Sequence, residues 1–334
     1  MQLLSTIIKF LLFTSFAVWL TACGGGGGGG DDKDVILSGK FVDSPVQGAN
    51  YAAGKKSGTT AADGGFRFES GNSLFLSIGD IQLGNGTARR IFTPLTLVNT
   101  ANPSDATVVN IASFLQTLDD DGDPNNGILI TQAVRTAAIG KTIDFAQSTT
   151  DFANDGNVQT VVAELTALTT AGARSLVSAA AAEAHLRSTL NDILNAGLGT
   201  YTGRSVNRVF NCDDSRYNRT NRSTGSITIT SVSLTANGAT FEGNGSFSLT
   251  EQGITFREDF SIIGNSNTID FSGALNGIIE ASAYADGVFQ GSDSSSYTGL
   301  LDGDSLTIVT PARPDVDFGF VVCDLSGSTL TLSK

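Results

Sequence analysis

Histidine, cysteine and tryptophan are scarce in this chain, and their scarcity limits its chemistry. The 334 residues include one histidine, three cysteines and one tryptophan. A serine-hydrolase triad needs a histidine beside its nucleophile, and a zinc site needs several histidine or cysteine ligands. The single histidine, His185, has no partner histidine, cysteine or acidic residue at suitable spacing, so we assign it to helix packing. Triad hydrolases and zinc enzymes are therefore excluded.

Charge is also sparse, and positive charge most of all. Charged residues make up 16% of the chain, and 20 Lys and Arg face 33 Asp and Glu, for a net charge of −13. Phosphate backbones are bound by clustered Lys and Arg, so nucleic acid is excluded as a partner. The abundance of Gly, Ser, Thr and Asn instead favours β-rich extracytoplasmic domains with many turns.

Long apolar runs are missing beyond the N-terminus, where residues 1–22 have the pattern of an export signal. Lys9 is the one charge in it, and the apolar run is short for a spanning helix. The motif Leu20-Thr21-Ala22-Cys23 resembles the lipobox of bacterial lipoproteins. The resemblance implies cleavage before Cys23 and acyl chains on this residue, which anchor the protein to a membrane. An ordinary secretory signal with a chance cysteine is the alternative.

Residues 23–34 form a tether after the anchor. Seven consecutive glycines follow Cys23, and a glycine run does not fold by itself. Because Gly24 rather than Asp occupies the second mature position, the lipoprotein resemblance implies the outer membrane of a Gram-negative bacterium, on a side that the sequence does not specify.

The predicted lipid anchor at Cys23 leaves two other cysteines that can pair with each other. If Cys23 carries lipid, Cys212 and Cys323 are left in an oxidising compartment, so we predict that they form a disulfide. Closing such a long loop stabilises the fold by about 4–5 kcal/mol in the chain-entropy picture, before any strain is subtracted.

Residues 35–98 are predicted to form a small β module. Alternating or β-branched segments separated by turns predict strands at 35–42, 49–52, 66–69 and 74–78. These segments are similar to the transthyretin-like, carboxypeptidase-regulatory type of β-sandwich, which implies a scaffold or binding module. The motifs that carry the resemblance are Gly39-Lys40-Phe41-Val42-Asp43, Val46-Gln47-Gly48-Ala49 and Asp63-Gly64-Gly65-Phe66-Arg67-Phe68. Ala61 departs from the pattern, which usually has an acidic residue there.

Residues 99–198 are predicted to be helical. Ser104 or Asp105 is placed to cap a first helix, and Asp155 precedes a second amphipathic segment. A third, alanine-rich helix is predicted over 173–194. The segments Asn110-Ile111-Ala112-Ser113-Phe114-Leu115-Gln116-Thr117-Leu118-Asp119 and 175–190 resemble a group of proteobacterial lipoproteins, whose members are mostly uncharacterised.

An acidic loop inside the helical region is the best metal candidate. Asp119, Asp121 and Asp123 alternate, and Asn125 follows at the same spacing. Calcium is bound by six to eight oxygens, and alternate acidic residues of a curling loop can converge on one ion. Neither register of the loop supplies the bidentate Glu of an EF-hand. Calcium is therefore a possible cofactor, with another hard cation or a solvated acidic turn as alternatives.

Residues 199–334 are predicted to form a larger β domain. Short alternating segments recur with Gly, Asn and Asp turns between them, which is typical of a sandwich or an up-and-down barrel. We expect an antiparallel meander curled into a barrel or half-barrel, with a bulge near Ser231 where the alternation shifts phase. The whole chain is thus expected to be mainly β with a helical middle segment (α+β).

Five arginines gather near the start of this domain. A contact surface for anionic glycan or lipid headgroups would need such a cluster, although a solvated loop that balances Asp213 and Asp214 is the simpler interpretation. The cluster comprises Arg204, Arg208, Arg216, Arg219 and Arg222.

Together these features predict a membrane-anchored bacterial lipoprotein that is not an enzyme. Its expected role is binding or structural at the cell envelope, with a glycan or an envelope protein as partner. A carrier with a lipid or other apolar ligand in the C-terminal barrel is one alternative. A glycan-active enzyme with two carboxylates, one of them with a raised pKa in a cleft, is another.

Overall fold

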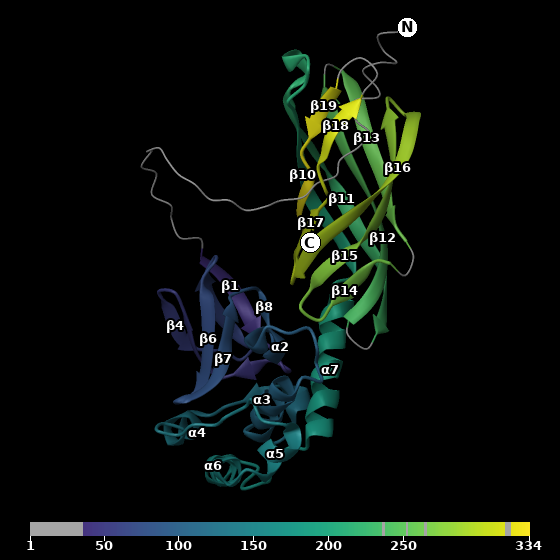
Figure 1. Ribbon diagram of the computed structural model, residues 1–334. Helices are drawn as coiled ribbons and strands as arrows, with labels where there is room; N and C mark the ends of the chain where they lie inside the picture. Colours follow the sequence, from purple (N-terminus) through teal and green to yellow (C-terminus); the bar gives the residue numbers. More distant parts are fainter. Residues whose placement is uncertain (1–35, 236–237, 252, 264–265, 318–321) are drawn as a thin grey trace. The chain divides into compact units, whose positions relative to one another are not determined.

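The computed structural model describes residues 36–235, 238–251, 253–263, 266–317 and 322–334 (Figure 1). The chain divides between Ile193 and Leu194 into two compact units. The first combines small sheets with helices, and the second is an antiparallel β-barrel. The predicted class, mainly β with a helical middle segment, is confirmed.

The first unit contains two small sheets, and the strands expected from the sequence are present in them. One sheet has the order β5-β1-β8, the other has the order β4-β3-β6-β7, and β2 pairs separately with β9. The strands are β1 (Ile36–Phe41), β2 (Val46–Gln47), β3 (Asn50–Ala53), β4 (Lys56–Thr59), β5 (Gly65–Glu69), β6 (Ser73–Ile78), β7 (Ile81–Thr87), β8 (Ile91–Phe92) and β9 (Ile128–Leu129).

Helices of the first unit begin where the sequence offers caps. The Asp105 carboxylate accepts from the backbone N–H groups of Thr107 and Val108, and Asp155 accepts from that of Val158, as expected of N-caps. The helices are α2 (Pro94–Val98), α3 (Ala106–Thr117), η1 (Pro124–Asn126), α4 (Gln132–Ala137), α5 (Thr149–Asn154), α6 (Gly156–Thr166) and α7 (Ala179–Ala196).

The predicted start of the third helix, at residue 173, is wrong, because α7 begins at Ala179. The preceding segment makes hydrogen bonds to other elements instead. The N–H of Arg174 donates to Thr166 Oγ1 at 3.1 Å, and that of Val177 donates to Thr117 Oγ1 at 2.8 Å. These side chains satisfy backbone groups that a helix would otherwise use.

One hydrophobic core joins the sheets and the helices of the first unit. Phe41, Phe66 and Phe92 come from the β5-β1-β8 sheet, and Phe114 of α3 and Leu165 of α6 belong to the same buried cluster. The β module and the helical region therefore exclude water from a shared interior. None of the helices among the described residues is long and apolar enough to cross a membrane.

The second unit is a closed barrel, which is one of the two forms expected. Within the described part of the chain, eight antiparallel strands follow one another around the ring, and β20 closes it by pairing with β10. The ring strands are β10 (Gly199–Phe210), β11 (Arg219–Thr235), β12 (Gly238–Glu251), β13 (Ile254–Ile262), β15 (Ala274–Ala285), β16 (Val288–Asp302), β17 (Ser305–Val309) and β20 (Thr329–Ser333).

Short elements extend the barrel. The segment β14 (Thr268–Asp270) pairs with β12 and β15, and β19 (Val322–Leu325) pairs with β10 and β18 (Arg313–Asp317). The register between β11 and β12 shifts between Ile229 and Ser231, which confirms the bulge predicted near Ser231.

Alternation along the strands divides their side chains between the interior and the outer surface. Cross-strand pairs place Phe247 opposite Glu258 and Leu249 opposite Phe256 on the inner face. Gly225 also faces inward, where an added Cβ would collide with the backbone carbonyl of Ser246. The glycine therefore permits a close approach of two neighbouring strands.

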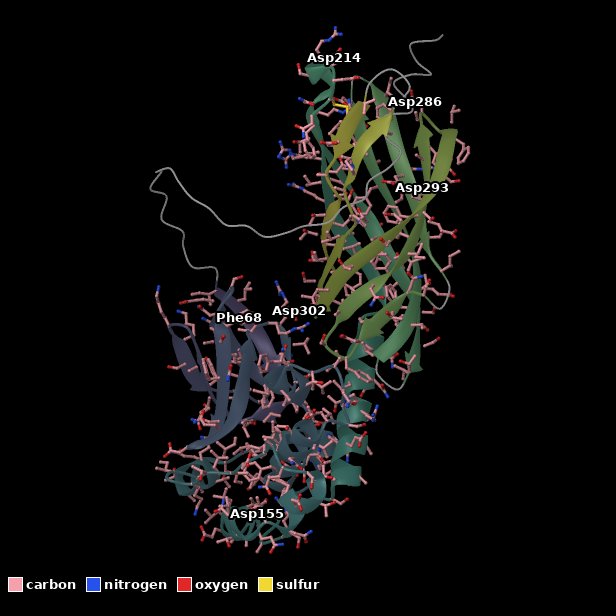
Figure 2. All side chains as sticks on the ribbon, in the orientation of Figure 1. Phe68, Asp155, Asp214, Asp286, Asp293 and Asp302 are labelled. Carbon is pink, nitrogen blue, oxygen red and sulfur yellow. A yellow bond between two sulfur atoms is a disulfide. The ribbon has the colours of Figure 1, made fainter. Side chains whose placement is uncertain are left out.

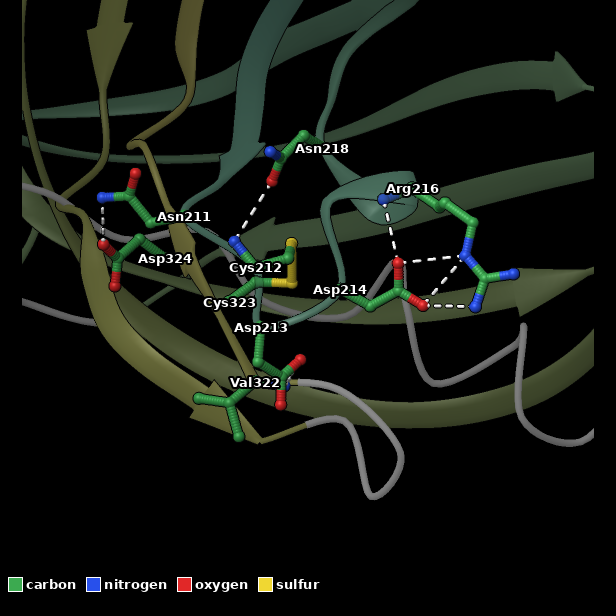
Figure 3. Close-up of a disulfide and its surroundings, with 9 residues drawn as sticks. All are labelled: Asn211, Cys212, Asp213, Asp214, Arg216, Asn218, Val322, Cys323 and Asp324. Carbon is green, nitrogen blue, oxygen red and sulfur yellow. Dashed lines mark hydrogen bonds and ion pairs between the residues drawn. A yellow bond between two sulfur atoms is a disulfide. The ribbon is translucent and has the colours of Figure 1, made fainter.

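The predicted disulfide is confirmed at one end of the barrel. Cys212 follows β10 and is bonded to Cys323 of β19 (Figure 3). The Cys212 N–H donates to Asn218 Oδ1 at 3.1 Å, and Asn211 Nδ2 donates to Asp324 Oδ2 at 2.8 Å. The bridge thus joins two segments whose polar groups also hold each other in place.

Candidate functional site

A polar groove on the outer surface of the barrel is a candidate binding site. It has a volume of about 560 Å³ and crosses β11, β12, β13 and β15. Its lining is rich in hydroxyl, amide and carboxylate groups: Ser226, Thr228, Asn244, Ser246, Asp259, Ser261, Glu280, Ser282 and Tyr284.

Strand register arranges this lining in two rows. One row runs from Ser226 through Ser246 and Asp259 to Ser282, each residue paired with the next across neighbouring strands. A parallel row leads from Thr228 to Glu280 through Asn244 and Ser261. Because successive side chains of a strand point to opposite faces, this regular polar surface results from small polar residues at every second position.

An aromatic and cationic pair lies beside the rows. The Arg257 guanidinium is 4.5 Å from the centroid of the Tyr284 ring, and its Nη2 is 2.9 Å from Asp259 Oδ2. Tyr284 also packs edge-on against Phe289, with ring centroids 5.8 Å apart. These contacts restrain the Tyr284 ring at the groove, next to its hydrogen-bonding groups.

Two smaller cavities lie inside the barrel. Each has about 40 Å³ of space, and both are lined by Ser205, Phe247 and Glu258. Asp293 of β16, labelled in Figure 2, lines the first of them, and Asn207 lines the second. Burial raises the pKa of the Glu258 carboxyl to about 7. A carboxyl group therefore faces a small, partly open space inside the barrel.

The structure separates the five arginines singled out in the sequence. Arg204 and Arg208 lie exposed on one face of β10, and exposed Arg222 is on the neighbouring strand, opposite Val206. Arg219 is on the inner face of β11 and pairs with Glu251 at 3.4 Å, and Arg216 pairs with Asp214 at 2.5 Å (Figure 3). Three of the five thus share an outer surface where an anionic ligand could bind.

The acidic loop is ordered by hydrogen bonds among its own residues. Asp119 is buried and its Oδ1 accepts from the Leu129 N–H at 2.8 Å, and burial raises its pKa. The Asp121 carboxylate accepts from Asn126 Nδ2, which lowers its pKa, and Asp123 accepts from the side chain and the N–H of Asn125. Among the described residues, no three His, Cys, Asp or Glu side chains are grouped as metal ligands. Calcium at Asp119, Asp121, Asp123 and Asn125 stays a prediction.

His185 has a partner that its sequence neighbourhood does not indicate. Its Nε2 lies 3.1 Å from Ser44 Oγ, and the Ser44 N–H donates to Thr189 Oγ1 at 3.2 Å. Ser44 has a left-handed backbone with φ of 59°. Because the next residue is Pro45, the N–H that often follows a nucleophile in an oxyanion hole is lacking. The contacts hold the turn after β1 against α7.

Neither the groove nor Glu258 was singled out from the sequence. A signal for the groove is present, because Ser, Thr and Asn recur at every second position of consecutive strands. No comparable signal marks Glu258, since its burial depends on the closure of the barrel. The lipidation site Cys23 and the glycine tether lie outside the described residues.

Comparison with known proteins found no match to a family, to a curated protein or to a solved structure. The site is therefore interpreted from its own geometry.

Proposed function

We propose that this protein is a non-catalytic binding module of the bacterial cell envelope, and that the outer groove of its barrel binds a glycan. The observation that carries the proposal is the groove itself, about 560 Å³ lined by hydroxyls, an amide, two carboxylates and Tyr284. Sugars present many hydroxyl groups that both donate and accept hydrogen bonds. Ser, Thr, Asn and carboxylate side chains complement them, and an aromatic face packs against the sugar ring.

The location in the envelope rests on the lipobox resemblance at Cys23. Acyl chains on this residue would hold the protein at the outer membrane, and the glycine run would let the folded units reach away from the bilayer. The disulfide is consistent with an oxidising compartment, where such bonds persist.

Cavity size favours the binding module over the two alternatives. Each interior cavity has about 40 Å³, room for very few water molecules, which is small for an acyl chain. Glu258 and Asp293 line the same cavity, the arrangement sought for a carboxylate enzyme, but that space is also small for a sugar ring. The open outer groove is the better match in size to a glycan.

A bulky residue in the groove tests the proposal. We expect the full chain in detergent to bind members of a printed oligosaccharide array, and titration calorimetry with the best array ligand to give its Kd. Ser246→Trp places an indole in the middle of the first row and should weaken binding at least tenfold. Ser248→Trp is the matched control, because Ser248 lies on the same face of β12 but does not line the groove.

The two tryptophan variants separate groove binding from general damage. Equal binding by wild type and Ser246→Trp would place the ligand elsewhere. Equal loss in both variants would indicate a disturbed barrel rather than a blocked groove. An array on which wild-type protein binds no oligosaccharide would contradict the glycan assignment.

A further inference from the structure

Two hydrogen-bond acceptors inside the barrel have no partner in the part of the chain that the structure describes. The Glu258 carboxyl makes no hydrogen bond or ion pair with any described residue, and the Asn207 Oδ1 atom is buried without a partner. Burying an unpaired polar group costs about 1–3 kcal/mol, and a buried charge costs more. The buried Asn207 Oδ1 atom and the Glu258 carboxyl in the same cavity lining therefore offer acceptors to a hydrogen-bond donor that the described residues do not supply.

Both groups line the same cavity from different strands. Asn207 extends from β10 and Glu258 from β13, and Phe247, Phe256 and Ala283 supply apolar walls around them. Ser205, Asn221, Ser223 and Arg257, which pairs with Asp259, add further polar residues to the lining. The second cavity meets this one at Glu258 and Phe247. The available space is suited to a small molecule with one polar end and a short apolar body.

The orphan atoms define the chemistry of the ligand. A carboxylate and an amide oxygen accept hydrogen bonds, so the missing partner must donate them. A primary ammonium group carries three N–H donors, no acceptor and a positive charge that complements the carboxylate. The rings of Phe247 and Phe256 can add a cation–π attraction.

We propose that the barrel interior binds a small primary ammonium compound through Glu258, with Asn207 as a second acceptor. This site is separate from the outer groove, and its ligand differs in charge from a neutral glycan. A metal ion fits the site less well, because a single carboxylate faces the shared space and Asp293 lines only the adjoining cavity.

Binding at this site should depend on pH. The ammonium binds the ionised carboxylate, and burial raises the pKa of Glu258 to about 7. Affinity should therefore rise about tenfold between pH 6 and pH 8. Of the residues that line the two cavities, Asp293 and Arg257 are the other charged ones. The cross-strand neighbours of Glu258 itself, Phe247 and Ala283, do not titrate.

Calorimetry with simple amines provides the test. The full chain in detergent is titrated with methylammonium and propylammonium at pH 6 and pH 8, and with tetramethylammonium, which has the charge but no N–H donor. We expect the primary amines to bind, more tightly at pH 8, and tetramethylammonium to bind at least tenfold more weakly. Glu258→Gln should abolish binding, whereas Glu242→Gln, an exposed acid on β12, should leave it unchanged.

Several outcomes would overturn the proposal. Primary amines that do not bind at millimolar concentration, or bind Glu258→Gln as tightly as wild type, would refute it. Calcium or potassium binding that Glu258→Gln abolishes, without amine binding, would assign the site to a metal ion. Far-ultraviolet circular dichroism checks that Glu258→Gln is folded. Because Ser246→Trp leaves the cavity intact, amine binding in that variant separates this proposal from the glycan proposal.

Discussion

The Asp43 carboxyl is fully buried in the first unit and incompletely bonded. Its Oδ2 accepts a hydrogen bond from Gln116 Nε2 at 2.9 Å, and its Oδ1 has no partner. Burial raises its pKa from 3.8 to about 7, although the bond from Gln116 acts in the opposite direction. The folded protein therefore keeps a proton here at pH values where the unfolded chain has released it.

Asp43→Asn should remove part of the pH dependence of stability. Between pH 3.8 and pH 7 the folded state binds the extra proton, so the free energy of unfolding falls as pH rises through this range. The full shift corresponds to about 4 kcal/mol as an upper figure. Urea unfolding at pH 5 and pH 8 should show that the variant loses less stability than wild type over this interval.

Asp63→Asn is the control for this prediction. Asp63 is exposed and pairs with Lys40 at 3.0 Å, and this bond lowers its pKa. The small stability that the ionised Asp63 contributes is present above its ordinary pKa of 3.8 and is lost only below that pH. The control should therefore match wild type between pH 5 and pH 8. Glu258 gives stability a pH dependence of the same sign as that of Asp43, and this contribution is the same in wild type and in both variants. An Asp43→Asn variant with the full wild-type slope would contradict the assignment.

Residue roles were predictable from the sequence where they depend on near neighbours. The cap of α3 was narrowed to Ser104 or Asp105 because a cap bonds to N–H groups two or three residues ahead, and Asp105 is the residue that does so. The contact of His185 with Ser44 spans 141 residues of sequence, so spacing gave no indication of it. The raised pKa values of Asp43 and Glu258 likewise depend on burial by distant segments.

At the scale of single elements, strand glycines determine how closely the barrel strands pack. Gly225 of β11 faces Phe247 of β12, and the carbonyl of Ser246 occupies the space that a side chain at residue 225 would need. The main chain of β12 therefore fills the space beside residue 225. This strand cannot move away without breaking the hydrogen bonds that it makes with its neighbours.

Gly225→Ala should destabilise the barrel by about 1–3 kcal/mol, the usual cost of overpacking a well-filled interior. Gly156→Ala is a matched control, since Gly156 begins α6 and an added Cβ there meets no atom within 4 Å. Alanine is also the better helix former, so the control should be neutral or slightly more stable. Thermal unfolding of both variants checks the difference. Equal melting temperatures would contradict the proposed clash.

Element types were predicted more reliably than element ends. Alternation identified the strands, and its change of phase located the bulge at Ser231, because side-chain direction reverses there. The start of α7 was misplaced because helix-forming residues of 173–178 bond to Thr117 and Thr166 instead. Tertiary hydrogen bonds overrode local propensity at this boundary.

At the scale of the whole molecule, a disulfide restrains the barrel between residues 111 positions apart. A loop of this length gives about 4–5 kcal/mol in the chain-entropy picture, so Cys212→Ser should lower the free energy of unfolding by up to that amount. Denaturant unfolding with and without reductant measures the loss. In a Cys23→Ser background, thiol counting on the oxidised chain should find no free thiol. Two free thiols would contradict the bridge.

Alternation and turn spacing predicted a β domain in the last third of the chain but left open whether it closes. Closure depends on the pairing of β10 with β20, for which neither strand carries a local signal. The groove could not be predicted for the same reason. Its two rows of polar side chains can be identified only once the register of four strands is known.

The closing pair also sets an order of events during synthesis. Thr202 and Ser333 are partners across 131 positions, so a growing chain exposes β10 with an unpaired edge until β20 has been made. Contacts this distant in sequence form slowly, and open strand edges recruit other chains. Newly made barrel strands therefore need protection from aggregation for the whole time that the last strand is awaited, and a ribosome that stalls before Thr329 leaves a ring that cannot close.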